Sequence, residues 1–357
     1  MNIGILSMQE IKNYGSFLQA FSLKNTIESL GHECSFINIV PGAQLGDYKI
    51  GRAHRLKLLA ERLRGRDFVS RLRYIYKFQS RFSREFLPAL GVGRGRTTGH
   101  FDTVVIGSDE VFNCAQKTWW GFSPQLFGQG LDADKVITYA ASFGATTVPV
   151  LESLGIRDTV ATLLKNIDSI SVRDDNSFEV VSKLTGSEPL RHVDPVVIFD
   201  YSRFLPSSVS MKRCCLLYTY PGRITNKAEI AAIRQFASVR GLQLVSIGHY
   251  FPWVDKVVVP TPFEVLACFR SADYVITDTF HGSVFSLKYN RPFATLVRDM
   301  NSNKLTSLLR QFGLEGRIAR CAADIPSIMD SPIDYDTVNA IIELETNRSV
   351  EYLKDRL

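Results

Sequence analysis

The sequence lacks the motifs and residue spacings that mark several common classes of protein. Its six cysteines are scattered over 357 residues without a Cys-x-x-Cys pair, which argues against a zinc site or a disulfide framework. Neither G-x-G-x-x-G nor a Walker lysine motif occurs, so binding of a dinucleotide or a nucleoside triphosphate is disfavoured. We therefore expect no metal site, no bound cofactor, and reduced, mostly buried cysteines.

Long apolar runs are also missing. The N-terminal residues carry no basic flank and their apolar run is too short for a signal peptide, and no window reaches the length of a membrane span. These absences predict a cytoplasmic protein. Cys214 and Cys215 adjoin in a strand-like run, and because neighbouring strand residues point to opposite faces, we expect them in core packing rather than in a redox or metal pair.

The length of the chain predicts two domains, because 357 residues exceed what one hydrophobic core usually serves. Apolar residues make up 45% and charged residues 22%, which is ordinary for a soluble globular protein. We place an N-terminal domain at 1–204 and a C-terminal domain at 205–330, with a turn-forming linker at 206–208. A final helix within 331–357 is expected to pack across their junction.

Strand-like and helical stretches alternate in both halves. Such alternation predicts an α/β fold of parallel sheets with helices on both faces, and two such units in tandem predict a cleft between them. Strands are expected at 3–6, 35–40, 103–106, 136–141, 169–172, 191–193, 215–218, 242–247, 274–277 and 293–297. Helices are expected at 16–30, 150–165, 227–240 and 262–270, after residue 281, and within 335–357.

The most informative stretch is 277–283, which reads TDTFHGS. It follows a short apolar run typical of a buried strand and precedes residues whose spacing suits a helix. His281 is therefore expected at a carboxyl strand end, beside the backbone N–H groups of a helix start, where ligands of open α/β sheets bind. A histidine after a strand is often structural, but the position beside Gly282 favours a catalytic role.

Polar residues follow three other expected strands and are candidate ligand contacts. Each group has a structural alternative, because helix capping explains the polar residues of the first two turns and a surface ion pair explains the arginine. The candidates are Asn13 and Ser16 in the first turn, Ser108, Asp109 and Asn113 in the second, and Arg173 after the strand at 169–172.

The net charge of +6 is unevenly distributed. Residues 41–100 contain fourteen Lys and Arg against four Asp and Glu, and fourteen minus four gives this segment +10. Apolar residues interrupt the charges at near-helical spacing, which suits amphipathic helices on an anionic inner membrane surface or around a lipid diphosphate. A solvated helical face is the alternative. Nucleic-acid binding is disfavoured because no nucleic-acid module accompanies the charge, and we assign about 44–100 to a basic helical insertion.

Together these stretches resemble the polysaccharide pyruvyl transferase family. The resemblance rests on the order and spacing of 13–20 (NYGSFLQA), 107–113 (GSDEVFN), 171–174 (SVRD), 194–195 (DP) and 277–283 (TDTFHGS), within about residues 3 to 312. It implies a GT-B-like architecture of two Rossmann-like domains facing a cleft. It also implies transfer of the enolpyruvyl group of phosphoenolpyruvate onto two sugar hydroxyls, which releases phosphate and leaves a cyclic ketal. Acceptors in the family are cell-envelope or capsule saccharides, often on a lipid diphosphate carrier.

The resemblance also implies roles for individual residues. Carried over by position, His281 is the catalytic histidine and Arg173 a ligand of phosphoenolpyruvate. Some members have Arg-Leu-His where this chain has Thr279, Phe280 and His281, so an arginine that could hold the phosphate is absent. Lys304 is the candidate replacement or partner, alongside Lys288 and Arg298. The remaining expected contacts are Gly282 and Ser283 with phosphoenolpyruvate, and Asn13, Tyr14, Ser16, Gln19, Ser108 and Asn113 with a lipid-linked or free saccharide acceptor.

The expected chemistry explains why these residue types are needed. A carboxylate and a phosphate require charge-assisted donors, which Arg173 and Lys304 supply. An unperturbed imidazole titrates near neutral pH. His281 is thus predicted to protonate the methylene carbon and make C2 electrophilic, with Asp109 as the base for the sugar hydroxyl. Two other functions stay open: a GT-B glycosyltransferase that uses a nucleotide sugar, and a non-catalytic saccharide-binding relative.

Overall fold

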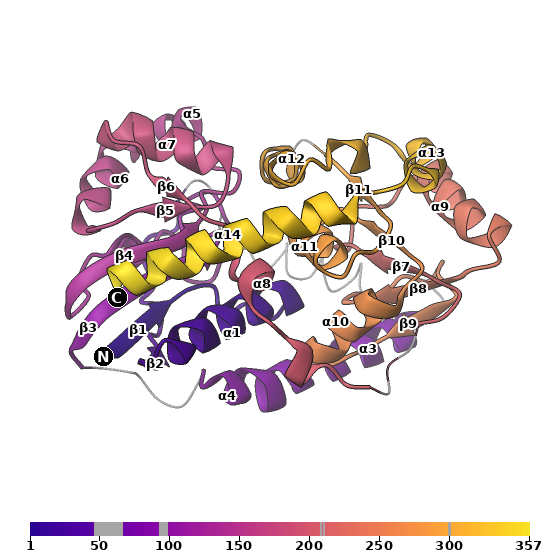
Figure 1. The fold of residues 1–357 in the computed structure, drawn as a ribbon, viewed down its shortest axis with the longest axis horizontal. Coiled ribbons are helices and arrows are strands. Elements are labelled where there is room, and N and C mark those ends of the chain that lie inside the picture. The colour runs from indigo at the N-terminus through magenta and orange to yellow at the C-terminus, as the bar shows by residue number, and fades with distance from the viewer. Residues whose placement is uncertain (46–66, 93–98, 208, 210, 299–300) are drawn as a thin grey trace.

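The computed structural model contains two parallel β-sheets, one in each half of the chain (Figure 1). It describes residues 1–45, 67–92, 99–207, 209, 211–298 and 301–357. The N-terminal sheet consists of β1 (Asn2–Leu6), β2 (Glu33–Phe36), β3 (Phe101–Asp109), β4 (Ala133–Ala141), β5 (Ser171–Val172) and β6 (Leu190–Arg191). The C-terminal sheet consists of β7 (Cys214–Tyr218), β8 (Gln243–Ile247), β9 (Lys256–Val258), β10 (Tyr274–Thr277), β11 (Phe293–Leu296) and β12 (Ile318–Ala319).

Helices cover both faces of each sheet, so each sheet lies between two apolar cores. Parallel strands buried in this way read as near-continuous apolar runs. The α-helices are α1 (Tyr14–Ser29), α3 (Phe68–Arg81), α4 (Leu87–Leu90), α5 (Val148–Ser153), α6 (Arg157–Leu163), α7 (Asp175–Thr185), α8 (Pro195–Ile198), α9 (Lys227–Val239), α10 (Pro262–Ser271), α11 (Phe280–Lys288), α12 (Ser302–Gln311), α13 (Ile325–Asp330) and α14 (Tyr335–Arg356).

Strand β7 shows how a strand buried on both faces divides its side chains between two cores. All five of its residues are buried, and its two adjacent cysteines belong to different cores: Cys214 to the one that contains Val275, and Cys215 to the one that contains Ile233. Both thiols are free, and burial raises their pKa to about 12 and above. The prediction that the pair serves core packing is confirmed.

The strand order of each sheet contains one reversal. The N-terminal order is β2-β1-β3-β4-β5-β6, so the chain moves outward from β1 to β2 and returns to β3 on the other side of β1. The C-terminal order, β12-β11-β10-β7-β8-β9, has the same reversal at β7 and β10 and is the Rossmann order. Ligands of open parallel sheets bind at the carboxyl ends of the strands that flank such a reversal. The ends of β1, β3, β7 and β10 therefore mark the site.

The predicted α/β fold class is confirmed, but most stretches differ from their predicted bounds by a few residues, and two of these differences have a clear physical reason. The helix expected at 150–165 is divided into α5 and α6, because Gly155 between them adopts a left-handed conformation with φ +66°. The strand expected at 35–40 starts earlier and ends at Phe36, since its pairing with β1 runs from Asn2 opposite Glu33 to Ile5 opposite Phe36.

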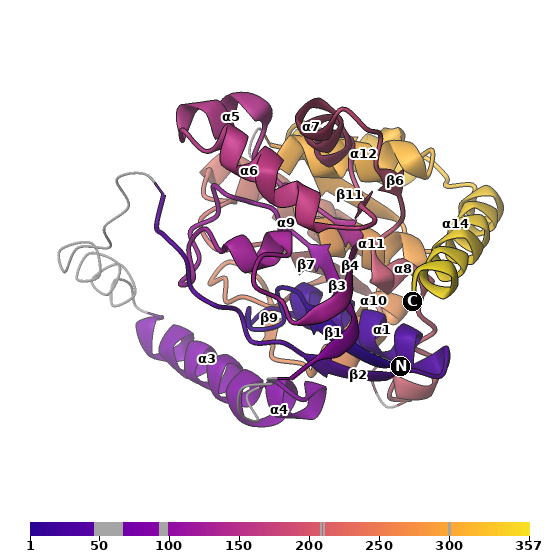
Figure 2. The ribbon, with the colours of Figure 1, turned by 90° about the vertical axis from the view of Figure 1, so that its left-hand side faces the viewer.

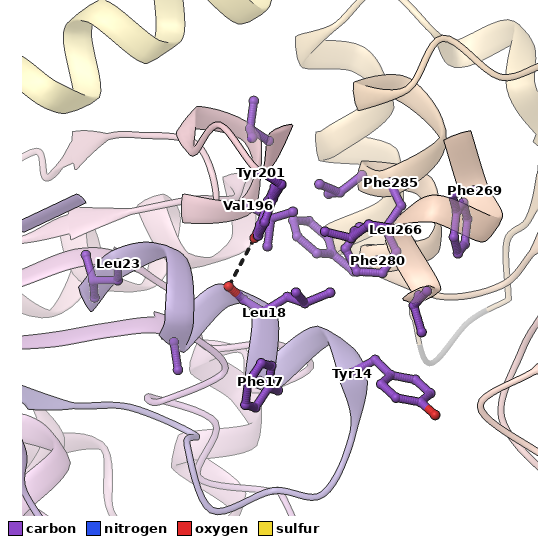
Figure 3. Close-up of a cluster of buried hydrophobic side chains, with 14 of the residues drawn as sticks. Tyr14, Phe17, Leu18, Leu23, Val196, Tyr201, Leu266, Phe269, Phe280 and Phe285 are labelled. Atoms are coloured by element: carbon purple, nitrogen blue, oxygen red, sulfur yellow. Dashed lines mark hydrogen bonds between the residues drawn. The ribbon is translucent and has the colours of Figure 1, made fainter. Parts of the chain in front are cut away.

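One apolar core joins the two halves of the chain (Figure 3). Helix α1 contributes Phe17 and Leu18 to this cluster, and α11 of the second half contributes Phe280 and Phe285. Tyr201, on the segment between the halves, donates a hydrogen bond to the Leu18 carbonyl at 3.2 Å. Because burial of apolar surface is the dominant favourable term in folding, this cluster holds the halves in a fixed relation.

Helix α14 runs back from the second half to the first (Figure 1). At its start, the Tyr335 hydroxyl donates to the carbonyl of Arg291 in the C-terminal half. Near its end, the Tyr352 hydroxyl donates to the Thr138 carbonyl of β4 at 2.8 Å, and its ring lies 4.4 Å from that of His192. The helix thus contacts both halves along its length.

Part of the basic segment lies along the outside of the molecule (Figure 2). Nine of its fourteen basic residues fall in 46–66 and 93–98, outside the described residues. The described part is α3, a π-helical turn (Phe82–Phe86) and α4. The Phe78 ring meets that of Tyr14 edge-on at 5.4 Å, and the Tyr74 ring lies 6.3 Å from that of Tyr250, so one side of α3 packs inside the protein. Within the described ranges, no helix combines the length and apolarity needed to cross a membrane.

Candidate functional site

The ends of β1, β3, β7 and β10 surround a cleft of about 430 Å³ between the two halves. A hollow of about 540 Å³ beside α9 is larger, but only α9, β8 and adjoining loop residues line it, and it contains none of the predicted site residues. The cleft is lined from the first half by Asn13, Ser16, Asp109, Glu110, Asn113 and Arg173, and from the second by Tyr218, Tyr220, Arg223, Thr279, Phe280, His281 and Lys304, among others.

His281 lies in the first turn of α11, which begins directly after β10. Thr279 caps this helix, and its Oγ1 accepts a hydrogen bond from the Gly282 N–H at 2.9 Å. The imidazole is 10% exposed, and its Nε2 lies 3.6 Å from Asp194 Oδ2. This distance is too long for a hydrogen bond but suits an ion pair once the imidazolium forms. The prediction that His281 follows a strand end and opens a helix is confirmed.

Gly15, in the first turn of α1, packs directly against the imidazole of His281. A Cβ atom at this position would lie 2.2 Å from His281 Nδ1 and 2.5 Å from its Cγ. Real side chains do not tolerate such distances, so the absence of a side chain at position 15 permits the observed place of the imidazole. The first turn of α1 therefore approaches the first turn of α11 this closely because Gly15 carries no side chain.

Arg173 is the buried centre of a charge network. Its Nη1 donates to Asp194 Oδ2 at 2.6 Å and its Nη2 to Asp109 Oδ1 at 3.0 Å. The guanidinium lies 4.2 Å from the centre of the Phe280 ring, and the side chain is 1% exposed. One cation thus bridges two carboxylates, which leaves a net negative charge next to His281.

Asp194 stays ionised although it is buried. Burial raises the pKa of a carboxyl, but the charges of His281 and Arg173 and the hydrogen bond from the Val196 N–H outweigh this effect and hold the pKa of Asp194 at about 2. Its Oδ1 accepts from Val196 at 3.0 Å and so caps the short helix α8. The same carboxylate therefore fixes a helix start and the Arg173 guanidinium, and it faces the imidazole.

Lys304 reaches the cleft from α12 and forms an ion pair with Glu110, which follows β3. Burial acts to raise the pKa of Glu110, but the charge and hydrogen bond of Lys304 and the hydrogen bond of Asn113 hold it at about 2. Asn113 Nδ2 donates to the same carboxylate at 2.6 Å. The pair joins the two halves across the cleft, so an anion that binds Lys304 competes with Glu110.

Arg223, in the loop after β7, supplies another cation to the cleft. Its Nη1 donates to the Asp278 carbonyl at 2.9 Å and lies 3.4 Å from Asp278 Oδ1, while the guanidinium lies 4.6 Å from the centre of the Tyr220 ring. Burial raises the pKa of Asp278, and neither of its carboxylate oxygens has a hydrogen-bond partner within the described ranges. The Arg223 side chain is 21% exposed and is accessible to a ligand.

Two predicted contacts with phosphoenolpyruvate lie behind the wall of the cleft instead of lining it. The N–H of Gly282 donates to Thr279 Oγ1, and a Cβ at position 282 would lie 2.1 Å from Thr277 Oγ1. The Ser283 side chain is fully buried and shares a hydrogen bond with Thr295 Oγ1 at 2.9 Å. These residues hold the start of α11 against the sheet, so their predicted ligand contacts are not supported.

Three predicted acceptor contacts also lie outside the cleft, whereas Asn13, Ser16 and Asn113 line it. Tyr14, Gln19 and Ser108 instead direct their side chains into the protein, where their polar groups find hydrogen-bond partners. The Tyr14 hydroxyl donates to the Pro260 carbonyl at 2.7 Å, Gln19 Nε2 to Ser7 Oγ at 2.8 Å, and Ser108 Oγ to the Ala140 carbonyl at 3.1 Å.

Neither alternative to Lys304 lines the cleft. Lys288 Nζ donates to the Val197 carbonyl at 2.8 Å, and burial lowers the pKa of this lysine to about 8. Arg298 Nη2 pairs with Glu229 at 2.7 Å. Of the three candidates for holding phosphate, only Lys304 is in place.

Asp194, Glu110 and Arg223 were not among the predicted site residues. The signal that could have found them is the strand-end rule, because Glu110 follows β3 directly and Arg223 lies in the loop after β7. Asp194 stands three residues after β6 and opens a helix with Pro195. Its contact with Arg173 depends on the packing of β5 beside β6, which no local pattern reveals.

Solved structures share this architecture. A putative UDP-N-acetylglucosamine 2-epimerase from Listeria monocytogenes superposes with a TM-score of 0.53 at 11% identity, covering 98% of this chain and 94% of that one. The glycotransferase of kitacinnamycin gives 0.50 at 12% identity, covering 100% and 98%. MnaA of S. aureus, solved with UDP, gives 0.50 at 12% identity, covering 96% and 90%. At such identities the likeness shows the fold alone, a GT-B-like pair of Rossmann-like domains.

The sequence also matches a known family. No curated protein matches it individually. A sequence model of the polysaccharide pyruvyl transferase family, however, matches residues 13–300, which include the ends of β3, β7 and β10 and the whole of α1 and α11. The match therefore contains most of the residues that line the cleft. The chain belongs to the polysaccharide pyruvyl transferase family.

Proposed function

We propose that this chain transfers the enolpyruvyl group of phosphoenolpyruvate to a saccharide and forms a pyruvate ketal. The observation that carries the proposal is the placement of His281 in the cleft, with the ionised Asp194 3.6 Å behind its Nε2. A carboxylate in this position stabilises the imidazolium, the form that can donate a proton. Membership of the family supplies the class of reaction.

The cations of the cleft suit the two anionic groups of phosphoenolpyruvate. We propose that Arg223 and Lys304, both partly exposed, hold the phosphate. Arg223 takes the place of the arginine missing at position 279, since it already bonds the carbonyl of the neighbouring Asp278. Arg173 remains the proposed ligand of the carboxylate, and its Nε has no hydrogen-bond partner within the described ranges.

The proposed reaction proceeds by an addition at C2 followed by a displacement of phosphate from the same carbon. His281 donates a proton to the methylene carbon, and a sugar hydroxyl attacks C2 while its proton passes to Asp109. The second hydroxyl then attacks C2 and its proton passes to the neutral His281, while the bond from C2 to the phosphate oxygen breaks and the phosphate leaves with the proton that Asp109 had taken up. Asp109 already accepts hydrogen bonds from Ser16 at 2.8 Å and from Arg173, but an ionised carboxylate can accept more than two.

The test is release of phosphate from phosphoenolpyruvate by the wild-type protein with a panel of nitrophenyl and lipid-linked sugars. We expect release only when an acceptor is present, and a product that carries the pyruvyl group on two oxygens of one sugar. A parallel reaction contains UDP-sugars in place of phosphoenolpyruvate. Sugar transfer in that arm, without phosphate release in the first, would contradict the proposal and favour a glycosyltransferase.

Replacing Arg223 by alanine is expected to raise KM for phosphoenolpyruvate by about 10-fold to 100-fold, the value of one charge-assisted hydrogen bond. Initial rates at varied phosphoenolpyruvate concentration measure the change. Arg298→Ala is the matched control, because Arg298 pairs with Glu229 and does not line the cleft. An unchanged KM in Arg223→Ala would remove this residue from the phosphate site.

Replacing Gly15 by alanine is expected to lower kcat by about 100-fold, because the added methyl group displaces the His281 imidazole and such displacements are costly to catalysis. Alanine itself favours a helix, so the thermal midpoint of unfolding should not fall as kcat does. Gly316→Ala is the control, since nothing lies within 4 Å of a Cβ added there. A Gly15→Ala protein with wild-type kcat would show that this contact does not position His281.

A further inference from the structure

The outer face of α3 and the π-helical turn that follows carry exposed apolar side chains among basic ones. Val69 is 54% exposed and Tyr76 69% exposed, and Arg73 and Lys77 beside them are also exposed. These positions follow one another at i, i+4, i+7 and i+8, so they share one side of the helix. Arg84 extends the basic surface into the turn and is likewise exposed.

The positive charge of this outer face is not neutralised. Residues 67–92 contain five Lys and Arg and two Asp and Glu, which leaves +3. Each acid is already paired inside the segment, Asp67 with Arg71 at 3.7 Å and Glu85 with Arg81 at 3.1 Å. Within the described ranges, no ion pair involves the other three basic residues, which are Arg73, Lys77 and Arg84.

We propose that the outer face of α3 and the π-helical turn, defined by Val69, Arg73, Tyr76, Lys77 and Arg84, docks on an anionic lipid surface. Basic residues near such a surface gain about 1 kcal/mol each. Exposed Val69 and Tyr76 suit the boundary between headgroups and acyl chains, where aromatic and aliphatic side chains of an interfacial helix lie. A polyanion such as nucleic acid would use the charges but not the valine, and so the lipid surface fits the whole face better.

The inner side of the same helix packs against α1 and the loop after β8, which gives the docking surface a fixed relation to both halves of the chain. Phe78 packs between Tyr14 and His249, with rings 5.4 Å and 6.4 Å away. Lys12 Nζ donates to Ser83 Oγ at 2.7 Å, and its two neighbours in the chain, Ile11 and Asn13, line the cleft. A bilayer bound to this outer face therefore lies next to the segment between β1 and α1, which lines part of the cleft.

The inference stands on the helix surface and is tested by binding alone, independently of the proposed reaction. The full chain is sedimented with vesicles of phosphatidylcholine and with vesicles of equimolar phosphatidylcholine and phosphatidylglycerol. We expect binding only to the anionic vesicles, weakened by salt. Arg73→Gln/Lys77→Gln/Arg84→Gln should lower the partition coefficient by roughly 100-fold, at about 1 kcal/mol for each basic residue. Lys227→Gln/Arg320→Gln/Lys354→Gln, which removes the same charge from other exposed positions, should bind as the wild type does.

A second variant separates a lipid surface from a generic polyanion. Val69→Ser/Tyr76→Ser should weaken binding to anionic vesicles and leave any binding to duplex DNA unchanged. Equal losses in the two charge variants would overturn the proposal, because they would reflect net charge only. Vesicle binding that is insensitive to Val69→Ser/Tyr76→Ser, with DNA bound as tightly, would overturn it in favour of a nucleic-acid surface. Circular dichroism of each variant confirms that its helices are intact.

Discussion

Replacing His281 by alanine is expected to lower the rate of phosphate release by about 10²-fold to 10⁴-fold, the usual contribution of a positioned general acid. The imidazole is the titratable group placed between the opening of the cleft and the buried Asp194. Its removal leaves Asp194 and Asp109 still paired with Arg173, which bonds both. The fold should therefore survive while the reaction does not.

Two further proteins make this result specific. His281→Gln keeps hydrogen-bonding groups and much of the volume but cannot transfer a proton, so it should be as inactive as the alanine variant. His100→Ala removes an exposed histidine that pairs with Asp132 and Asp134 far from the cleft and should be fully active. Recovery of activity in His281→Gln would contradict proton donation and leave His281 a packing role.

The location of the site could be predicted from the sequence because strand ends are visible in it. Strands buried on both faces appear as short apolar runs, and β10 was placed at its observed bounds, which put His281 at a strand end. The same rule brought Asp109, Asn113 and Arg173 to the cleft. These predictions need only local pattern and the fact that parallel strands end at one edge of a sheet.

The inward or outward direction of the side chains at those ends could not be predicted. Gly282 and Ser283 share the motif of His281, yet their polar groups are used by Thr279 and Thr295 to hold α11 on the sheet. A helix start exposes some of its groups and buries the rest according to what packs behind it. Tertiary contacts, here those of β10 and β11, determine which of these groups are buried, and the motif does not.

The nearness of Arg223 to position 279 was equally hidden from the sequence. Thr279 stands where some family members have an arginine, and Arg223 lies close to that position only because β7 and β10 pair in parallel, with Tyr218 opposite Thr277. The two loops that follow these strands are more than fifty residues apart in the chain, as the hydrogen bond from Arg223 to Asp278 spans 55 positions. Sequence reasoning therefore proposed the basic residues Lys304, Lys288 and Arg298, and the last two lie outside the cleft.

Replacing Asp194 by alanine is expected to destabilise the protein by about 3–5 kcal/mol, the cost of leaving a buried charge without its partner. Arg173 is 1% exposed and would keep only Asp109 as a partner, and α8 would lose its capping oxygen. Asp194→Asn retains the cap and lacks the charge, so it should be less destabilised while its rate of phosphate release falls. Asp334→Asn, at the exposed cap of α14, is the control and should match the wild type.

The dependence of stability on pH distinguishes charge from packing at this position. The folded state holds the pKa of Asp194 at about 2, below the value of about 3.9 for an unfolded chain. Its contribution is therefore complete above about pH 4 and is lost as the pH falls towards 2. In urea unfolding between these values, the wild type should lose more stability than Asp194→Asn, which carries no titrating carboxyl there. Parallel curves for the two proteins would mean that Asp194 acts through its shape and its cap, and that the imidazolium of His281 is stabilised by other groups.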